Sequence, residues 1–253
     1  MMQKNITAIC RQRGFTLTEL MVGMLLGIIV SMAVVAVYIL TMRASVDILS
    51  ATKLNQELRS VMTLISGDLR RAGFLEGSAS TVAGGGLDMV SDSCVLYVYD
   101  RNRSGVIDDD EVFGLREWTD ANGNTSIQMR INETADCDSD AGWMILTGGA
   151  GDPIGLTLRF TQIWLDEDGN EQEGDFLCRN RTVAPELMGE DCTTVLAAAD
   201  DWAASNPGIS QEIQQIRQVR VNLDGDLGDH RIRMEETVRI RNDRNITVAA
   251  SSS

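Results

Sequence analysis

Glu19 is the residue of this chain whose position most needs a chemical explanation. It ends the segment Gly14-Phe15-Thr16-Leu17-Thr18-Glu19 and directly precedes Leu20–Met42, a stretch of 23 residues without Lys, Arg, Asp or Glu. A carboxylate near the centre of a bilayer is energetically costly unless it is paired. The side chain therefore needs a partner, either a cation or the polar surface of a membrane.

The apolar run itself predicts a membrane-spanning helix at about residues 20–42. Its length corresponds to roughly 35 Å of helix, and a hydrocarbon core is about 30 Å thick. Lys4, Arg11 and Arg13 lie in the leader before Gly14, and that leader contains no Asp or Glu. The positive-inside rule therefore predicts a cytoplasmic N-terminus and a C-terminal part on the other side of the membrane. A secretory signal has a shorter apolar core, of about 7 to 15 residues.

The segment from Gly14 to Glu19, after a short basic leader and before an apolar helix, resembles the prepilin signal of type IV pilins and type II secretion pseudopilins. The resemblance implies that a membrane prepilin peptidase cuts between Gly14 and Phe15 and methylates the new Phe15 amine. It also implies that Glu19 pairs with the Phe15 amine of a neighbouring subunit in a fibre. The residues alone leave an alternative, a simple anchor whose Glu19 reaches the lipid headgroups.

Gly23, Gly27 and Ser31 recur every four residues along the predicted span. Small residues on one face let helix backbones approach closely in lipid, where packing drives association. The spacing therefore predicts a helix-packing face. The alternative is the ordinary glycine content of membrane helices.

An amphipathic pattern continues the helix beyond the membrane, with apolar residues every three or four positions up to Leu69. Arg70 and Arg71 suit a last turn and Gly73 suits the residue after a helix, so the predicted helix covers residues 15–72. The predicted organisation is a cleaved leader at 1–14, this helix, and a periplasmic β-rich globular domain at 73–253. The fold class is α+β.

Alternating apolar residues predict strands in the globular domain. They lie at Cys94–Asp100, Glu111–Trp118, Ser126–Asn132, Gly155–Leu165, Gln218–Leu223 and His230–Ile240. Hairpin turns are predicted at Asn122-Gly123, Asp168-Gly169 and Asp224-Gly225. Short helices are predicted at Thr194–Ala204 and after Ser210, and the tail from Asn242 is predicted to fray.

Two further segments, Gly67–Phe74 and Thr237–Asn242, resemble the large PilW-type minor pilins, which are relatives of the GspJ pseudopilins. That resemblance implies a non-enzymatic subunit that primes assembly of a pilus. Its implied partners are other major and minor pilins, the prepilin peptidase and the assembly platform of the inner membrane. No cofactor is required for such a role.

Removal of the leader would take away Cys10 and leave four cysteines, an even number that suits disulfides in an oxidising periplasm. Four cysteines allow three pairings. We favour Cys94 with Cys137 and Cys178 with Cys192, because these close the more local loops. A cysteine zinc site is the rival, but the chain has no CxxC pair and a single histidine.

Residues 100–111 reproduce the twelve-residue calcium loop of EF-hands, with glycine in the sixth place and glutamate in the twelfth. The oxygen ligands would be the side chains of Asp100, Asn102, Ser104, Asp108 and Glu111 with the carbonyl of Val106. Predicted strands, not paired helices, flank the loop. The alternative is therefore an acidic turn closed by its own side chains.

The remaining function classes have less support. The net charge of −15 disfavours nucleic-acid binding, which depends on neutralising phosphates. An adhesive or DNA-capturing tip protein would need a local basic surface, for which the candidates are Arg217, Arg220, Arg231, Arg233, Arg239 and Arg241. A membrane-anchored periplasmic enzyme is also less favoured, because the sequence contains no nucleophile elbow, phosphate loop or paired metal histidines. Sequence separates a pilus subunit from a type II secretion pseudopilin poorly.

Overall fold

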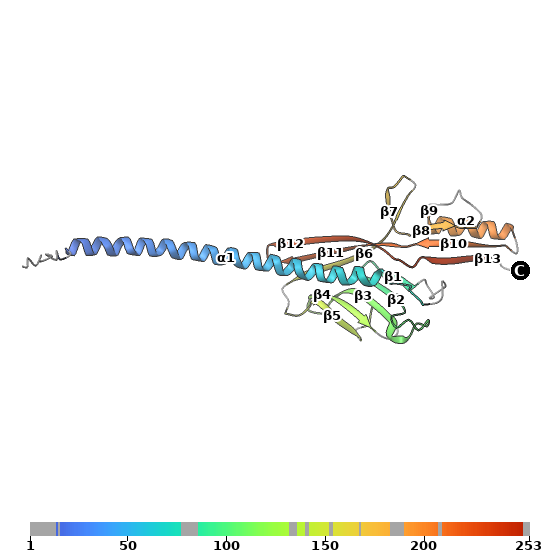
Figure 1. Cartoon of the computed structure of the whole chain (residues 1–253), viewed down its shortest axis with the longest axis horizontal. Helices are drawn as coiled ribbons and strands as arrows, with labels where there is room; N and C mark the ends of the chain where they lie inside the picture. The colour runs from blue at the N-terminus through green and yellow to red at the C-terminus, as the bar shows by residue number, and fades with distance from the viewer. Residues whose placement is uncertain are drawn as a thin grey trace, which may run out of the picture. The chain divides into compact units, whose positions relative to one another are not determined.

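The computed structural model describes residues 14, 16–76, 86–131, 136–139, 142–151, 154–166, 168–182, 190–206 and 209–249. It confirms the predicted α+β class: one long N-terminal helix, α1 (Leu17–Leu69), precedes a chain of antiparallel strands (Figure 1). The chain forms two compact units, residues 1–49 and 50–253, and α1 contributes to both. Phe15 and the predicted leader residues 1–13 lie outside the described residues.

Three antiparallel sheets make up the second unit. The first has the order β1-β2-β3-β4-β5, with bounds Leu87–Ser91, Cys94–Val98, Val112–Thr119, Thr125–Ile131 and Trp143–Gly148. The second has the order β12-β11-β6-β7, with bounds His230–Arg239, Gln218–Leu227, Gly155–Leu165 and Glu171–Glu173. The third has the order β13-β10-β8-β9, with bounds Arg244–Ala249, Ser210–Ile216, Leu177–Asn180 and Glu190–Asp191.

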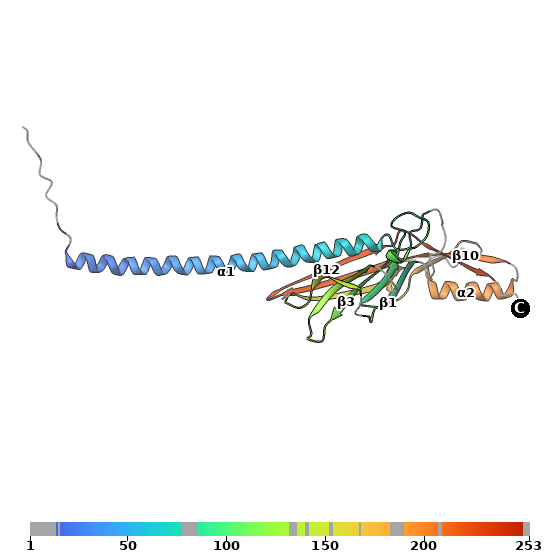
Figure 2. The ribbon, with the colours of Figure 1, turned by 90° about the horizontal axis from the view of Figure 1, so that it is seen from below.

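Two short helices complete the fold. The 3-10 helix η2 (Asp109–Glu111) directly precedes β3, and α2 (Cys192–Ser205) follows β9. The carboxylate of Asp191 accepts the Thr194 N–H at 2.9 Å, so α2 begins with a side-chain cap, two residues before the predicted Thr194. α2 packs beside β10 and β13 (Figure 2).

The core of the second unit lies between the C-terminal part of α1 and the sheets. The buried residues of the helix are Leu54, Leu58, Val61, Met62, Ile65, Ser66 and Leu69. A Cβ on Gly225 of β11 would lie 3.0 Å from atoms of Leu54 and Leu58, so the helix rests directly on this glycine. The predicted hairpin turn at Asp224-Gly225 is therefore wrong. Gly225 lies inside a strand, where the lack of a side chain lets α1 pack closely against it. Strand β11 continues to Leu227.

Two other predictions are corrected at the C-terminal end of the chain. The segment after Ser210 is strand β10, not a helix, because it pairs with β8 and β13 on its two sides. The predicted frayed tail is strand β13, which pairs with β10 over six residues and packs Ile246 and Val248 against the core. In both segments, pairing with strands distant in the sequence determines the secondary structure.

The end of α1 also differs from its prediction. The helix ends at Leu69, and tighter bonds take over, from the Arg71 N–H to the Asp68 carbonyl and from the Ala72 N–H to the Leu69 carbonyl. The side-chain amide of Asn242 donates to the carbonyls of Arg71 and Ala72 at 3.3 Å. A residue about 170 positions away thus satisfies carbonyls of the turn that follows α1.

Two disulfides join the pairs that the sequence favoured, Cys94 with Cys137 and Cys178 with Cys192. The second links β8 to the first residue of α2. The first places the Cys137 carbonyl 2.5 Å from Nη1 of Arg116, a buried side chain of β3. The disulfide thus fixes the segment around Cys137 over a buried guanidinium.

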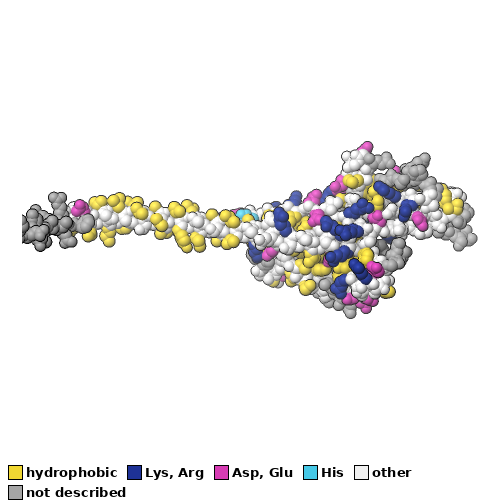
Figure 3. Space-filling view, viewed as in Figure 1, with side chains coloured by type: hydrophobic (Ala, Val, Ile, Leu, Met, Phe, Trp, Pro, Cys, Tyr) yellow, Lys and Arg dark blue, Asp and Glu magenta, His cyan; other side chains and the backbone are white. Residues whose placement is uncertain are grey.

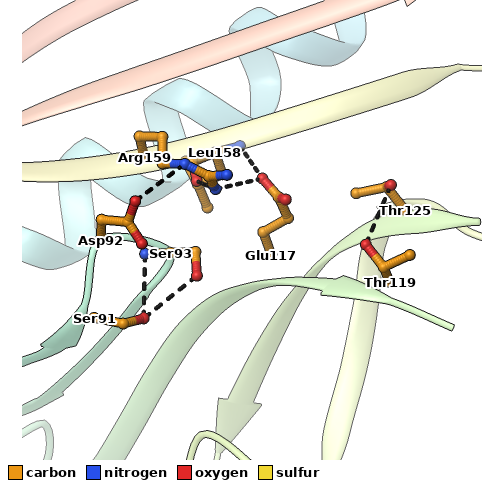
Figure 4. Close-up of polar contacts among 8 residues, drawn as sticks. All are labelled: Ser91, Asp92, Ser93, Glu117, Thr119, Thr125, Leu158 and Arg159. Atoms are coloured by element: carbon orange, nitrogen blue, oxygen red, sulfur yellow. Dashed lines mark hydrogen bonds and ion pairs between the residues drawn. The ribbon is translucent and has the colours of Figure 1, made fainter.

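A polar link joins β3 of the first sheet to β6 of the second (Figure 4). Oε2 of Glu117 accepts the Leu158 N–H at 2.6 Å and Nη1 of Arg159 at 3.0 Å. Arg159 also pairs with Asp92, with Nε and Oδ2 3.3 Å apart. One carboxylate thus acts as a strand partner for this part of β6.

Replacing Glu117 with Ala is expected to lower the free energy of unfolding by about 1 to 3 kcal/mol, because it leaves the Leu158 N–H without an acceptor. Glu117→Gln keeps an acceptor oxygen and should lose less. Thr119→Ala on the same strand removes only an exposed hydroxyl contact and is the control, expected to change stability by less than about 0.5 kcal/mol. Thermal unfolding of the full chain in detergent measures all three. Equal stability of the Glu117→Ala and Thr119→Ala proteins would contradict the proposed link.

Candidate site for processing and assembly

The first turn of α1 is closed by a capping box made from the predicted processing motif. Thr16 precedes the helix, and both its N–H and its hydroxyl donate to Oε2 of Glu19, at 3.0 and 2.9 Å. The Glu19 N–H lies 3.3 Å from the Thr16 hydroxyl in return. This is the reciprocal pairing of a Thr-x-x-Glu motif at a helix start. The spacing is visible in the sequence, but sequence reasoning overlooked it.

Glu19 therefore has a partner within its own chain, Thr16. The sequence had suggested two others, the Phe15 amine of a neighbouring subunit and the lipid headgroups. In the described part of the chain only its Oε2 atom is engaged. Gly14 is exposed, and among the described residues no heavy atom lies within 4 Å of the position that a Cβ would take there. Phe15, the predicted new N-terminal residue, lies outside the described residues.

Residues 16–49 that the structure describes are exposed, and the hydrophobic side chains of this first part of α1 are seen along it in Figure 3. Within the described residues, α1 is the one helix long and apolar enough to cross a membrane. A shallow groove on its surface is lined by Gly27 and Ser31 among larger apolar residues. The Ser31 hydroxyl donates to the Gly27 carbonyl at 2.7 Å, so it is satisfied without leaving its own helix. Among the described residues, no side chain contacts the Cβ position of Gly23.

The predicted calcium loop closes on its own backbone. Asp100 and Glu111 are buried, at 2% and 0% exposure. Asp100 accepts the N–H groups of Glu76, Ser104 and Gly105 at 2.8 to 3.1 Å. Glu111 accepts those of Arg101, Asn102 and Asp108 at 2.7 to 3.2 Å. This is the acidic turn named above as the alternative.

The smaller side chains of the loop make further internal bonds. Ser104 donates to the Val106 carbonyl at 2.9 Å, and the Asn102 amide donates to Oδ2 of Asp108 at 3.1 Å. Arg103 has φ 61°, the one positive value at a non-glycine residue in the described chain. The described residues contain no group of three or more His, Cys, Asp or Glu side chains arranged to hold a metal ion. Calcium binding stays a prediction.

Burial raises the pKa of Asp100, and backbone N–H donors led by Gly105 lower it by more, so its pKa lies below the usual value. A lowered pKa means that the folded chain favours the ionised carboxylate. Its contribution to stability is present above the ordinary Asp pKa of about 3.9 and is lost as the pH falls through the lower folded pKa.

A calcium titration can separate the two interpretations of the loop. A weak extracellular site, with a Kd of about 10⁻⁴ to 10⁻³ M, would stabilise the fold by about 1 to 3 kcal/mol in 10 mM Ca²⁺. Asp108 is exposed, so Asp108→Asn removes a charged ligand without disturbing the buried bonds, and it should reduce the rise in Tm. Melting curves in Ca²⁺ and in Mg²⁺ measure the effect. No rise in the parent protein in Ca²⁺ would rule the site out.

The arginines considered for a nucleic-acid surface are largely engaged within the chain. Arg233 makes a two-point pair with Asp224, at 2.7 and 3.1 Å. Arg220 pairs with three acids, Glu171, Glu173 and Glu235. Arg217 is 2% exposed and donates to the Asn242 carbonyl, and burial is the main cause that lowers its pKa to about 10. This favours paired arginines on a solvated sheet face.

Comparison with known families gives two matches. Residues 47–248 match a family described as prepilin peptidase-dependent protein B, and residues 9–37 match the prokaryotic N-terminal methylation motif. The second match contains Gly14, Phe15 and Glu19. No curated protein and no solved structure gives a significant match.

Proposed function

Because residues 47–248 place this chain in the prepilin peptidase-dependent protein B family, we propose that it is a minor pilin that is cut after Gly14 and acts in the assembly of a type IV pilus. The observation that carries the proposal is the position of the methylation motif. It covers residues 9–37 and ends in an apolar helix whose first turn holds the carboxylate of Glu19.

In this proposal α1 has two roles in sequence. Before assembly its apolar part anchors the chain once in the inner membrane, with the N-terminus in the cytoplasm and the second unit in the periplasm. After cleavage the same part packs against the helices of other pilins, with Gly23, Gly27 and Ser31 at close approaches. The prepilin peptidase and the assembly platform are its partners in the membrane.

The charge on Glu19 completes the proposed assembly step. Cleavage gives Phe15 a cationic amine at the start of an apolar segment, and an unpaired charge there is costly. The Oε1 atom of Glu19 on a neighbouring subunit can accept that amine while Oε2 keeps its bonds to Thr16. Capping within one chain and pairing between chains are therefore compatible.

A type II secretion pseudopilin is the second candidate, because the same motif and helix would serve it. Adhesion or DNA capture receives less support, because Arg220 and Arg233 are paired with acids on the sheet. Intact-mass analysis of the endogenous protein tests the proposal. Its expected result is a mature chain that begins at methylated Phe15.

A further inference from the structure

A basic groove lies where α1 ends, in a chain whose net charge is −15. The groove has a volume of about 550 Å³ and is bounded by the end of α1, the loop after β2 and the residues between β12 and β13. Its lining includes five arginines, Arg70, Arg71, Arg101, Arg103 and Arg241. Figure 3 shows Lys and Arg side chains gathered over the second unit.

Three of these arginines already have acidic partners. Nη2 of Arg70 lies 2.7 Å from Oε1 of Glu236, and Nη2 of Arg101 lies 2.8 Å from Oδ2 of Asp110. Arg71 pairs with Asp68 at 3.5 Å. These pairs hold three guanidinium groups in place around the groove.

The other two, Arg103 and Arg241, are exposed and have no ion pair within the part of the chain that the structure describes. Asp100 is the acid in the groove lining, and its carboxylate oxygens accept hydrogen bonds from backbone N–H groups. The left-handed backbone at Arg103 is costly for a residue with a side chain, and such strain persists only where the surroundings impose it. Two arginines are thus available to bind an anion.

The same chain carries an acidic element of suitable form. The hairpin between β6 and β7, residues 165–174, has five acids and no Lys or Arg, namely Asp166, Glu167, Asp168, Glu171 and Glu173. Figure 1 shows β7 and the described residues beside it projecting beyond the rest of the sheet. Asp166 bonds to Asn170 and Gln172 within the turn, whereas Asp168 at the tip is exposed. Asp168 therefore presents a carboxylate to solvent.

The groove and the hairpin lie at opposite edges of the second sheet, because Arg241 directly follows β12 and β7 is the strand at the other end of the order β12-β11-β6-β7. Arg70 in the groove pairs with Glu236, whereas Arg220, which binds the hairpin acids Glu171 and Glu173, pairs with Glu235. Successive side chains of a strand point to opposite faces. Within one chain, strands β11 and β6 separate the hairpin from the groove, and the acid-binding Arg220 faces away from the side on which Arg70 meets Glu236.

We propose that the acidic tip of this hairpin docks into the arginine groove of a second copy of the chain. The carboxylate of Asp168 would accept the guanidinium groups of Arg103 and Arg241, a geometry in which arginine donates through two parallel N–H groups. The contact is head-to-tail, because each copy offers a groove beside β12 and a hairpin at β7, which are two different surfaces. Such contacts can continue along an open assembly. The inference concerns the second unit and does not depend on leader cleavage.

Charge reversal with rescue tests the contact in the full-length chain. Two differently tagged copies, co-expressed and extracted in detergent at about 0.1 M salt, are assayed for co-capture. Arg103→Glu with Arg241→Glu in both copies should reduce co-capture about tenfold, and so should Asp168→Lys in both copies. Pairing a groove-reversed copy with a hairpin-reversed copy should restore it, because the new charges are again opposite.

Matched controls change the same charges elsewhere. Arg179→Glu with Arg231→Glu, and separately Asp200→Lys, alter exposed residues outside the groove and the hairpin and should leave co-capture unchanged. Contact through the apolar part of α1 would persist in every variant and at high salt, whereas the proposed contact weakens with salt.

Three results would overturn the inference. They are unchanged co-capture in both reversed proteins, loss without rescue in the mixed pair, and a groove reversal that abolishes binding to anionic phospholipid vesicles while co-capture persists. Altered leader cleavage with intact rescue would count against the proposed function alone.

Discussion

Gly14→Leu is expected to leave the chain uncut, so that the protein in the membrane keeps its first fourteen residues. This glycine is exposed, and no atom of the part of the chain that the structure describes lies within 4 Å of a Cβ placed there. A larger side chain should therefore spare both compact units. The substitution should instead impair cleavage, because the active site of the peptidase must accommodate the residue on each side of the cleaved bond.

Intact-mass analysis measures the outcome, with the melting temperature as the check on folding. Gly14→Ala adds only a methyl group at the same open position and is the matched variant, expected to be cut more readily than Gly14→Leu. Gly67→Ala changes another glycine with open space around it, far from the motif, and should be cut like the parent. Normal cleavage of the Gly14→Leu protein would remove the basis of the peptidase assignment.

Sequence reasoning found most of the strands whose signals are local. Gly155–Leu165 is predicted with its observed bounds, because the alternation of Leu156, Leu158 and Phe160 with more polar residues is a local signal. The turns at Asn122-Gly123 and Asp168-Gly169 also occur as predicted, with φ of 85° and 81° at the two glycines. In these elements the identity of neighbouring residues is enough to predict the local structure.

The errors occur where a distant segment decides the local structure. Gly225 looks like a turn residue, but its missing side chain makes room for Leu54 and Leu58, about 170 positions earlier. Strand β5 is short and its burial pattern is weak, so pairing with β4 defines it more than its own alternation does. Partners of this kind cannot be read from one stretch of sequence.

The candidate site shows the same division. The motif from Gly14 to Glu19 is a local signal, and neighbouring residues alone are enough to identify it. The groove at the end of α1 is not local, because Arg70, Arg103 and Arg241 come from three separate segments. Sequence reasoning grouped Arg241 with other arginines on a strand face. The fold places it beside the helix end instead.

Glu19→Gln is the variant that separates the two roles of this side chain. A glutamine oxygen can still accept the Thr16 N–H, so the capping box and the start of α1 should survive. The negative charge is lost, and with it the pairing proposed for the Phe15 amine of a neighbour. Because removing one partner of a buried ion pair strands the other charge, incorporation into sheared fibres is expected to fall at least about tenfold.

Thr16→Val provides the opposite change, since it removes the hydroxyl cap and keeps the charge of Glu19. Loss of such a cap typically costs a helix about 0.5 to 2 kcal/mol. A helix as long as α1, with its second part buried in the second unit, tolerates fraying at its first turn. The Thr16→Val protein should therefore enter fibres nearly as well as the parent, with immunoblots of sheared fibres normalised to membrane protein as the measure. If instead the Glu19→Gln protein assembled normally and the Thr16→Val protein did not, capping would be the function of Glu19 and the charge pairing would have to be abandoned.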